Sequence, residues 1–244
     1  IPTLRVAFIR RKEEYGMWWP GQIYDGEAAL KKYIQQITNT AKNLRMTVDI
    51  RPQPIYSLEE GEAWIAESEE KNADGLVVVT LDRQQHAWPT VNKAIDSKIP
   101  TIVFSPIGSS FTTNTAAPSK KKGVVIYSTD DFSQVEYGMK MIHAGAKLRE
   151  TRFLVIKGKE RVDTQLAHLG TGLRYIPADD FLSEYDRIPN DAALKNMADD
   201  LITYSTNVTG ATKQDVLNGI KSYFVAKNLL EREECDAISM DCLG

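Results

Sequence analysis

A polar segment that follows a short apolar run holds the residues best suited to contact a small molecule. Asp82, Arg83, His86 and Trp88 lie close together in it. Carboxylate and guanidinium groups can form paired bonds with sugar hydroxyls, and an indole ring can stack on the apolar C–H face of a sugar. We therefore predict that these residues bind a sugar or another small polar ligand. The alternative is a capped loop before the helix expected over residues 89–97.

A second polar segment, residues 10–20, combines clustered charge with aromatic surface. It contains Arg10 and Trp18, and we predict that both contact the ligand. The alternative is that it packs on a neighbouring domain or subunit, because clustered Trp and Arg are typical of interfaces. A third segment, residues 105–115, is rich in hydroxyl groups that could surround a polar ligand, but its composition favours a mobile surface loop.

The chain carries none of the short sequence signatures of common catalytic or cofactor sites. It has no P-loop, no zinc-type spacing, no Gly-x-Ser-x-Gly elbow and no complete dinucleotide fingerprint. Gly170-Thr171-Gly172 precedes an apolar run, which favours a helix-ending turn over a phosphate cradle. His86, His143 and His168 are far apart in sequence, which disfavours a metal site. We therefore predict no catalytic residue and no metal ligand.

The composition indicates a globular protein without a nucleic-acid partner. The 244 residues are 42% hydrophobic, and 30 basic and 33 acidic residues give a net charge of −3, so no basic surface is expected to attract a polyanion. The longest apolar runs are far shorter than the roughly 20 residues that span a bilayer, so we expect no membrane span. Two cysteines, Cys235 and Cys242, exclude a disulfide framework. The chain begins at Ile1, so the compartment stays open.

Short β-branched runs alternate with long amphipathic segments, a pattern typical of βα units that build a parallel sheet. The runs are apolar on both faces, as expected for strands covered by helices on both sides. Strands are expected at residues 6–9, 48–50, 76–79, 101–104 and 124–127. In open parallel sheets, ligands bind outside the carboxyl ends of the strands, so the three polar segments are expected to lie at one edge.

A new series of elements begins near residue 150. We expect a strand at 152–156 with its own helix, a strand at 173–176, three helices and a last strand at 237–240. The predicted fold class is therefore α/β, with two successive three-layer Rossmann-like or flavodoxin-like parallel-sheet domains. Their predicted ranges are 1–150 and 151–244, and the second is expected to be incomplete because the chain ends beside its last strand.

Four motifs, in this order and spacing, resemble the L-fucose isomerase-like family. These enzymes are manganese-dependent aldose–ketose isomerases with two amino-terminal α/β domains and a third, catalytic domain. The resemblance covers the whole chain. The motifs are the first strand ending in arginine (Val6 to Arg10), the loop from Asp82 to Trp88, the strand and glycine from Phe153 to Gly158, and the strand from Cys235 to Cys242.

The resemblance implies that this chain is the amino-terminal two-domain part of such an isomerase. Arg10 would reach into a neighbouring subunit's sugar site, Trp88 would stack on the sugar ring, and Asp82 and His86 would position them. It also implies a cytoplasmic homo-oligomer. The family's metal ligands would follow Gly244, so Mn²⁺ is expected only in a full-length protein, and this segment alone is expected to be inactive.

Two alternatives stay open at this point. A non-catalytic, two-lobed sugar-binding or sensing module, like the type I periplasmic binding proteins, would give a similar pattern of elements. Those proteins pass between their lobes three times, whereas the pattern here predicts one passage near residue 150. A divergent member of the isomerase-like family that has kept the fold and lost the activity is the other alternative.

Overall fold

The computed structural model describes residues 1–12, 25–83, 85–106 and 108–241. It divides the chain into two compact units, Ile1–Lys147 and Leu148–Gly244, called unit 1 and unit 2 below. The chain passes from one to the other within helix α5 (Ser133–Glu150), and the predicted domain boundary lies at the end of the same helix. Among the described residues, no helix is long and apolar enough to cross a membrane.

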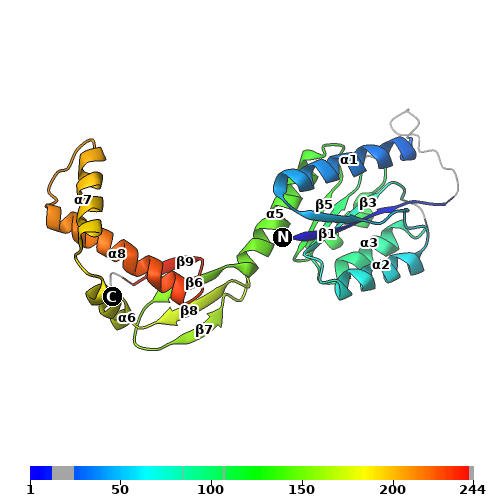
Figure 1. Ribbon diagram of the computed structural model, residues 1–244. Coiled ribbons are helices and arrows are strands. Elements are labelled where there is room, and N and C mark those ends of the chain that lie inside the picture. The colour runs from blue at the N-terminus through cyan, green and yellow to red at the C-terminus, as the bar shows by residue number, and fades with distance from the viewer. Residues whose placement is uncertain (13–24, 84, 107, 242–244) are drawn as a thin grey trace. The chain divides into compact units, whose positions relative to one another are not determined.

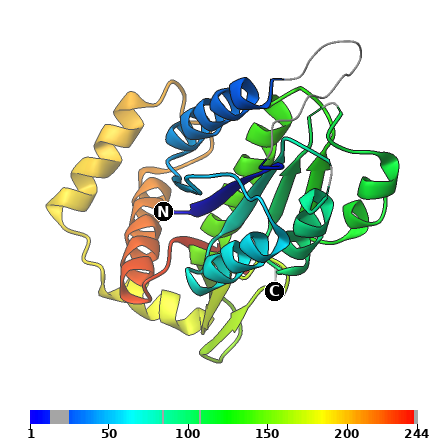
Figure 2. The same ribbon diagram turned by 90° about the vertical axis from the view of Figure 1, so that its right-hand side faces the viewer.

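Unit 1 is an α/β unit built on a parallel sheet with the strand order β2-β1-β3-β4-β5 (Figure 2). All five strands lie where the sequence predicts them. They are β1 (Thr3–Ile9), β2 (Thr47–Ile50), β3 (Gly75–Thr80), β4 (Thr101–Phe104) and β5 (Val124–Tyr127). The connecting helices are α1 (Gly26–Leu44), α2 (Leu58–Glu70), α3 (Ala87–Asp96), α4 (Thr112–Thr115) and the 3₁₀ helix η1 (Pro118–Lys120).

Helices cover both faces of this sheet, as the apolar strands predict (Figure 1). Alternate residues of β1 point to opposite faces. Phe8 packs in a cluster with residues of α1 and α5, whereas Ile9 packs in a second cluster with residues of α2 and α3. The core therefore consists of one apolar cluster on each face of the sheet. These two clusters fix the strand ends from which the loops leave.

Capping side chains fix where the helices begin. Asp25 accepts hydrogen bonds from the backbone N–H groups of Glu27 and Ala28 at the start of α1. Ser57 accepts one from Glu60 at the start of α2, as the capping-box pattern predicts. The Glu60 carboxylate in turn accepts from the backbone N–H of Tyr56, one residue before the cap.

Unit 2 contains a four-stranded sheet in the order β7-β8-β6-β9. Its elements are β6 (Arg152–Ile156), β7 (Val162–Gln165), β8 (Gly172–Ile176), α6 (Ala178–Arg187), α7 (Ala192–Tyr204), α8 (Lys213–Arg232) and β9 (Ala237–Met240). Strands β8, β6 and β9 are parallel, whereas β7 is antiparallel to β8. The helix predicted after β6 is absent, and β7 stands in its place.

The turn at Gly170 belongs to the β7–β8 hairpin, so the prediction of a helix-ending turn is wrong. The Gly170 N–H donates to the Leu166 carbonyl over 2.8 Å, and the Leu166 N–H donates to the Thr171 carbonyl over 2.9 Å. Gly170 adopts φ +69°, which glycine tolerates without a side-chain clash.

The helices of unit 2 lie on one side of its sheet. Helix α8 packs on Leu154, Ile156 and Ile176, and α7 packs on α8 (Figure 1). Side chains on the opposite face, such as Phe153 and Val155, are half-buried. No described helix of unit 2 packs on that face, so the unit has two layers where the sequence predicts three.

Candidate functional site

The strand order places a topological switch point between β1 and β3. The connection from β1 leads outward to β2 on one side, whereas β3 starts the series toward β5 on the other. Ile9 and Thr80 are paired in register at the ends of β1 and β3, so the loops that follow leave the sheet side by side. Open α/β sheets bind their ligands in the crevice at this position.

An ion pair joins these two loops. Arg11 Nε donates to Asp82 Oδ2 over 2.5 Å, and the backbone N–H of Arg83 donates to Asp82 Oδ1 over 2.7 Å. Asp82 is only 1% exposed. A buried carboxylate is stable when it is paired and hydrogen-bonded, so Asp82 positions the two loops and presents little surface to a ligand.

Arg10 lies at the same edge, on the side of β2. Its guanidinium pairs with Glu27 in the first turn of α1 and lies 5.8 Å from the centre of the Tyr56 ring. The Arg10 backbone N–H donates to the Ile55 carbonyl over 3.3 Å. Arg10 is therefore held between the loop after β2 and the start of α1.

Arg83 connects the loop after β3 with the loop after β4. Its Nη1 donates to the Gly108 carbonyl over 2.9 Å, and its guanidinium lies 4.6 Å from the centre of the Phe111 ring. Phe111 is 57% exposed. This contact places a cation and an accessible aromatic ring together at the carboxyl edge.

Trp88 lies in the core and does not reach this edge as a stacking surface. Its side chain is 4% exposed, and its Nε1 donates to the Ser109 carbonyl over 3.0 Å. The residue faces the sheet because it shares one side of α3 with Val91 and Ile95. The ring-stacking role predicted for Trp88 does not fit this position.

His86 and Trp18 complete the set of predicted contacts. His86 precedes α3, is partly exposed, and has its Nε2 3.0 Å from the Ile55 carbonyl. Trp18 lies outside the described residues. The structure therefore brings together Arg10, Asp82, Arg83 and His86 at one edge.

Buried hydroxyl groups fix the beginning of the segment predicted as a mobile loop. Thr80, Ser105 and Ser109 are each 0% exposed. The Ser109 hydroxyl lies 2.7 Å from the Ser105 hydroxyl and 3.0 Å from the Thr80 hydroxyl, and it donates to the Pro106 carbonyl over 2.7 Å. This network orders the backbone that carries Gly108 and Phe111.

Sequence reasoning missed Arg11, Tyr56 and Phe111 at this edge. Arg11 directly follows a predicted contact, and Phe111 is the only aromatic residue of the hydroxyl-rich segment 105–115. Both signals were present in the sequence. Tyr56 carried no comparable signal, because it follows a short strand with an ordinary loop composition.

The described residues of this edge carry more positive than negative side chains. Among the described residues, Arg10, Arg11 and Arg83 supply three guanidinium groups; Glu27 pairs with the first and Asp82 with the second. Helices α1 and α3 begin at this edge, and their amino-terminal dipoles add positive potential.

No metal-ligand set is found in the part of the chain that the structure describes. Within residues 1–12, 25–83, 85–106 and 108–241, no group of three or more His, Cys, Asp and Glu side chains is arranged to hold a metal ion. No described residue is therefore assigned to Mn²⁺.

Comparison with known proteins gives no family assignment. No protein-family model and no curated protein matches the chain. Among solved structures, it is similar to an ABC transporter periplasmic solute binding protein from Actinobacillus succinogenes 130z with bound D-allose. The identity is 13%, the TM-score is 0.35, and the match covers 98% of this chain and 77% of that one. A likeness this weak does not establish a shared function.

Proposed function

We propose that this chain binds a sugar, or a similar small polar molecule, at the carboxyl edge of the unit 1 sheet. The observation that carries the proposal is the Arg11–Asp82 ion pair. It joins the loops after β1 and β3 at the switch point, where α/β sheets bind their ligands. A specific binding site requires loops that are held in a fixed position, and the ion pair holds these two.

The surrounding side chains supply the chemistry of sugar recognition. Arg10 and Arg83 provide guanidinium donors, and His86 adds a ring nitrogen beside the Ile55 carbonyl. Tyr56 and Phe111 provide aromatic rings, the second of them largely exposed. Phe111 takes the stacking role in this proposal, because Trp88 is buried.

The proposal is limited to binding. Asp82 is engaged by Arg11 and by the Arg83 backbone, and His86 is engaged by the Ile55 carbonyl. General acid–base catalysis requires a group within hydrogen-bond reach of the substrate. We therefore assign neither residue a catalytic role.

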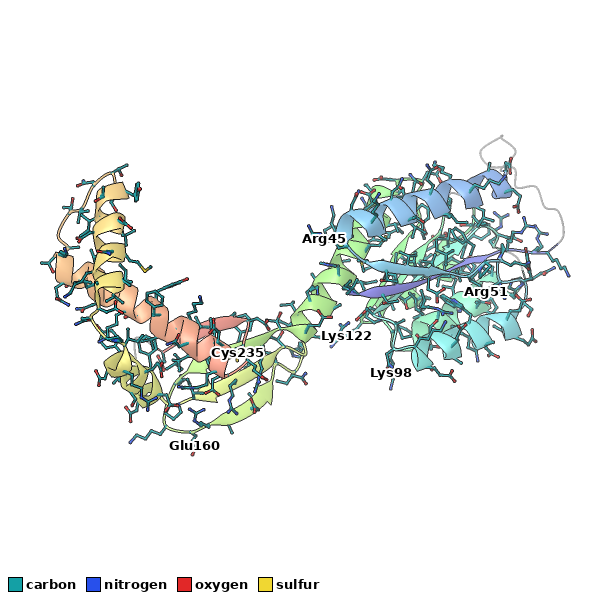
Figure 3. All side chains as sticks on the ribbon, viewed as in Figure 1. Arg45, Arg51, Lys98, Lys122, Glu160 and Cys235 are labelled. Atoms are coloured by element: carbon teal, nitrogen blue, oxygen red, sulfur yellow. The ribbon has the colours of Figure 1, made fainter. Side chains whose placement is uncertain are left out.

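Saturation-transfer NMR with a panel of neutral and acidic monosaccharides tests the proposal. At least one sugar is expected to bind saturably at one site per chain. The substitutions Arg10→Ala and Phe111→Ala should each weaken that binding at least about tenfold, which corresponds to about 1.4 kcal/mol. Arg45→Gln is the matched control, because Arg45 ends α1 at the opposite edge of unit 1 (Figure 3). Saturable binding that neither Arg10→Ala nor Phe111→Ala weakens would contradict the site, and no saturable binding would contradict the proposal itself.

A second candidate is a sugar-contacting subunit of a fucose isomerase-like enzyme. One observation favours it: within the described residues the chain passes between units 1 and 2 once, within α5, as the resemblance predicts. In this candidate Arg10 of one subunit serves a neighbour's sugar site, so the chain self-associates. Sedimentation velocity at micromolar concentration is expected to show a homo-oligomer. A monomer with intact sugar binding would leave only the first candidate.

A further inference from the structure

We propose that the ligand carries an oxyanionic group, a carboxylate or a phosphate, and that the Arg83 guanidinium binds this group through paired N–H donors. This inference rests on the proposed function and specifies its ligand class as acidic sugars. It depends on the balance of donors and acceptors among the described residues at the carboxyl edge of unit 1.

The Arg83 guanidinium is held in place by its contacts and has N–H donors that no described residue uses. Its Nη1 is held by the Gly108 carbonyl at 2.9 Å and its plane lies near the Phe111 ring. A guanidinium has five N–H donors. Among the described residues, none accepts a hydrogen bond from Nε or Nη2 of Arg83, which is partly exposed. These two nitrogens form the fork that matches a carboxylate or phosphate in bidentate geometry.

Among the described residues, the side-chain acceptors next to Arg83 are already engaged in hydrogen bonds. Both oxygens of Asp82 accept hydrogen bonds, one from Arg11 and one from the Arg83 backbone. The Ser109 hydroxyl is 0% exposed and donates to the Pro106 carbonyl. Farther along the edge, Glu27 is paired with Arg10.

These unused N–H donors favour acidic sugars over neutral ones. A neutral sugar presents hydroxyl groups that both donate and accept, so a site that fits it offers acceptors as well as donors. A carboxylate or phosphate only accepts when it is ionised, and it forms stronger, charge-assisted hydrogen bonds with a guanidinium. The described part of the edge therefore fits an oxyanion better than a hydroxyl.

Isothermal titration calorimetry with matched sugars tests the inference on the full chain. The probes are D-glucose, D-glucuronate and D-glucose 6-phosphate, together with D-galactose and D-galacturonate. Within at least one set, the acidic sugar is expected to bind at least about tenfold more tightly than its neutral counterpart. The uronates and the phosphate separate the two sources of the oxyanion.

Substitutions at Arg83 assign the preference to its guanidinium. Arg83→Gln should abolish the preference, so that within this variant the acidic sugar binds no more tightly than its neutral counterpart. Arg83→Lys keeps the charge and loses the fork, so it should retain only part of the preference. Arg45→Gln removes an exposed guanidinium at the end of α1 and should leave the preference unchanged.

The possible results separate the oxyanion preference from the sugar site itself. Equal binding of neutral and acidic sugars, or a preference that survives Arg83→Gln, would overturn the inference and leave the proposed sugar site intact. Binding of none of the five probes would overturn the proposed function as well. Circular dichroism spectra and thermal melting of each variant confirm that the chain is folded.

Discussion

The two units of this protein are stabilised in different ways. Unit 1 covers both faces of its sheet with apolar clusters, one with α1 and α5 and the other with α2 and α3. Unit 2 covers one face of its sheet, and a group of ion pairs around Glu233 ties the strands to the end of α8. The candidate site therefore lies on the unit whose sheet is covered on both faces, where the core fixes the positions of the loops.

Glu233 is the centre of the ion pairs in unit 2. It is 8% exposed, and its carboxylate is 2.9 Å from Arg161 Nη1 and 3.0 Å from Arg174 Nε. Burial raises the pKa of Glu233, but hydrogen bonds from Arg161 and Arg174 outweigh this effect and lower the pKa to about 2. Unit 2 therefore combines this group of ion pairs with an apolar core on one face of its sheet.

The largest loss of stability is expected from a substitution in the core of unit 1. Phe8→Ala removes a side chain that is 1% exposed and should lower the stability of unit 1 by about 3–5 kcal/mol, from lost burial plus a cavity. All four tryptophans lie within residues 1–147, so tryptophan fluorescence during denaturant unfolding follows unit 1. Native-state hydrogen exchange of β6 and α8 should stay unchanged. An equal loss of protection in unit 2 would show that the units unfold together.

The next largest loss of stability is expected when Glu233 is substituted. Glu233→Gln removes the negative charge that pairs Arg161 and Arg174 and should destabilise unit 2 by about 2 kcal/mol. This is less than for a fully buried pair, because the side chains of Arg161 and Arg174 are 41% and 24% exposed. Hydrogen exchange of α8 measures the loss. Glu231→Gln, at an exposed position of the same helix, is the control and should be near neutral.

The pH dependence of unit 2 should follow the same carboxylate. The pKa of Glu233 is about 2 in the folded chain and 4.5 in its ordinary state, so its contribution is complete above pH 4.5 and is lost as the pH falls toward 2. The difference in stability between the native chain and Glu233→Gln should shrink over this range. Acid titration followed by hydrogen exchange measures it. A difference that persists at pH 2 would exclude the ionised carboxylate as its source.

The smallest loss of stability is expected from a substitution at Trp88. Trp88→Phe keeps most of the buried ring and removes the N–H that donates to the Ser109 carbonyl, so unit 1 should lose about 1 kcal/mol. Amides near Gly108 and Phe111 should exchange faster, because the bond holds their segment. Chemical denaturation monitored by circular dichroism gives the stability. Unchanged exchange in residues 108–111 would show that the hydroxyl network alone orders the loop.

The sequence pattern predicted the elements that have a strong apolar signal and missed those that lack one. The strands of unit 1 are short, apolar on both faces and separated by amphipathic helices, so their pattern is unambiguous. Strand β7 reads Val-Asp-Thr-Gln, and every one of its residues is exposed. It pairs only with β8 at the sheet edge. Such an edge strand has little to distinguish it from a polar loop.

The sequence predicted which loops meet at the carboxyl edge of unit 1, and only some of the side chains that the structure places there. Arg10 and Asp82 follow strands that neighbour each other, and the carboxyl-edge rule brings them together. The Arg11–Asp82 pair depends on the register of β1 with β3, which becomes known only with the strand order. Trp88 shares a helical face with Val91, a spacing that indicates a core position. Residue type alone suggested a ligand contact instead.

Hydrogen exchange with and without a saturating acidic sugar shows which part of the chain binds the ligand. With D-glucuronate or D-galacturonate, whichever binds, protection is predicted in the described residues 10–12, 80–83 and 108–111 of unit 1, with no change in unit 2. The pocket of unit 2 lined by Leu194, Met197 and Phe224 serves as the internal reference. Protection confined to that pocket, or none at the carboxyl edge of unit 1 under saturating ligand, would contradict a sugar site at this edge.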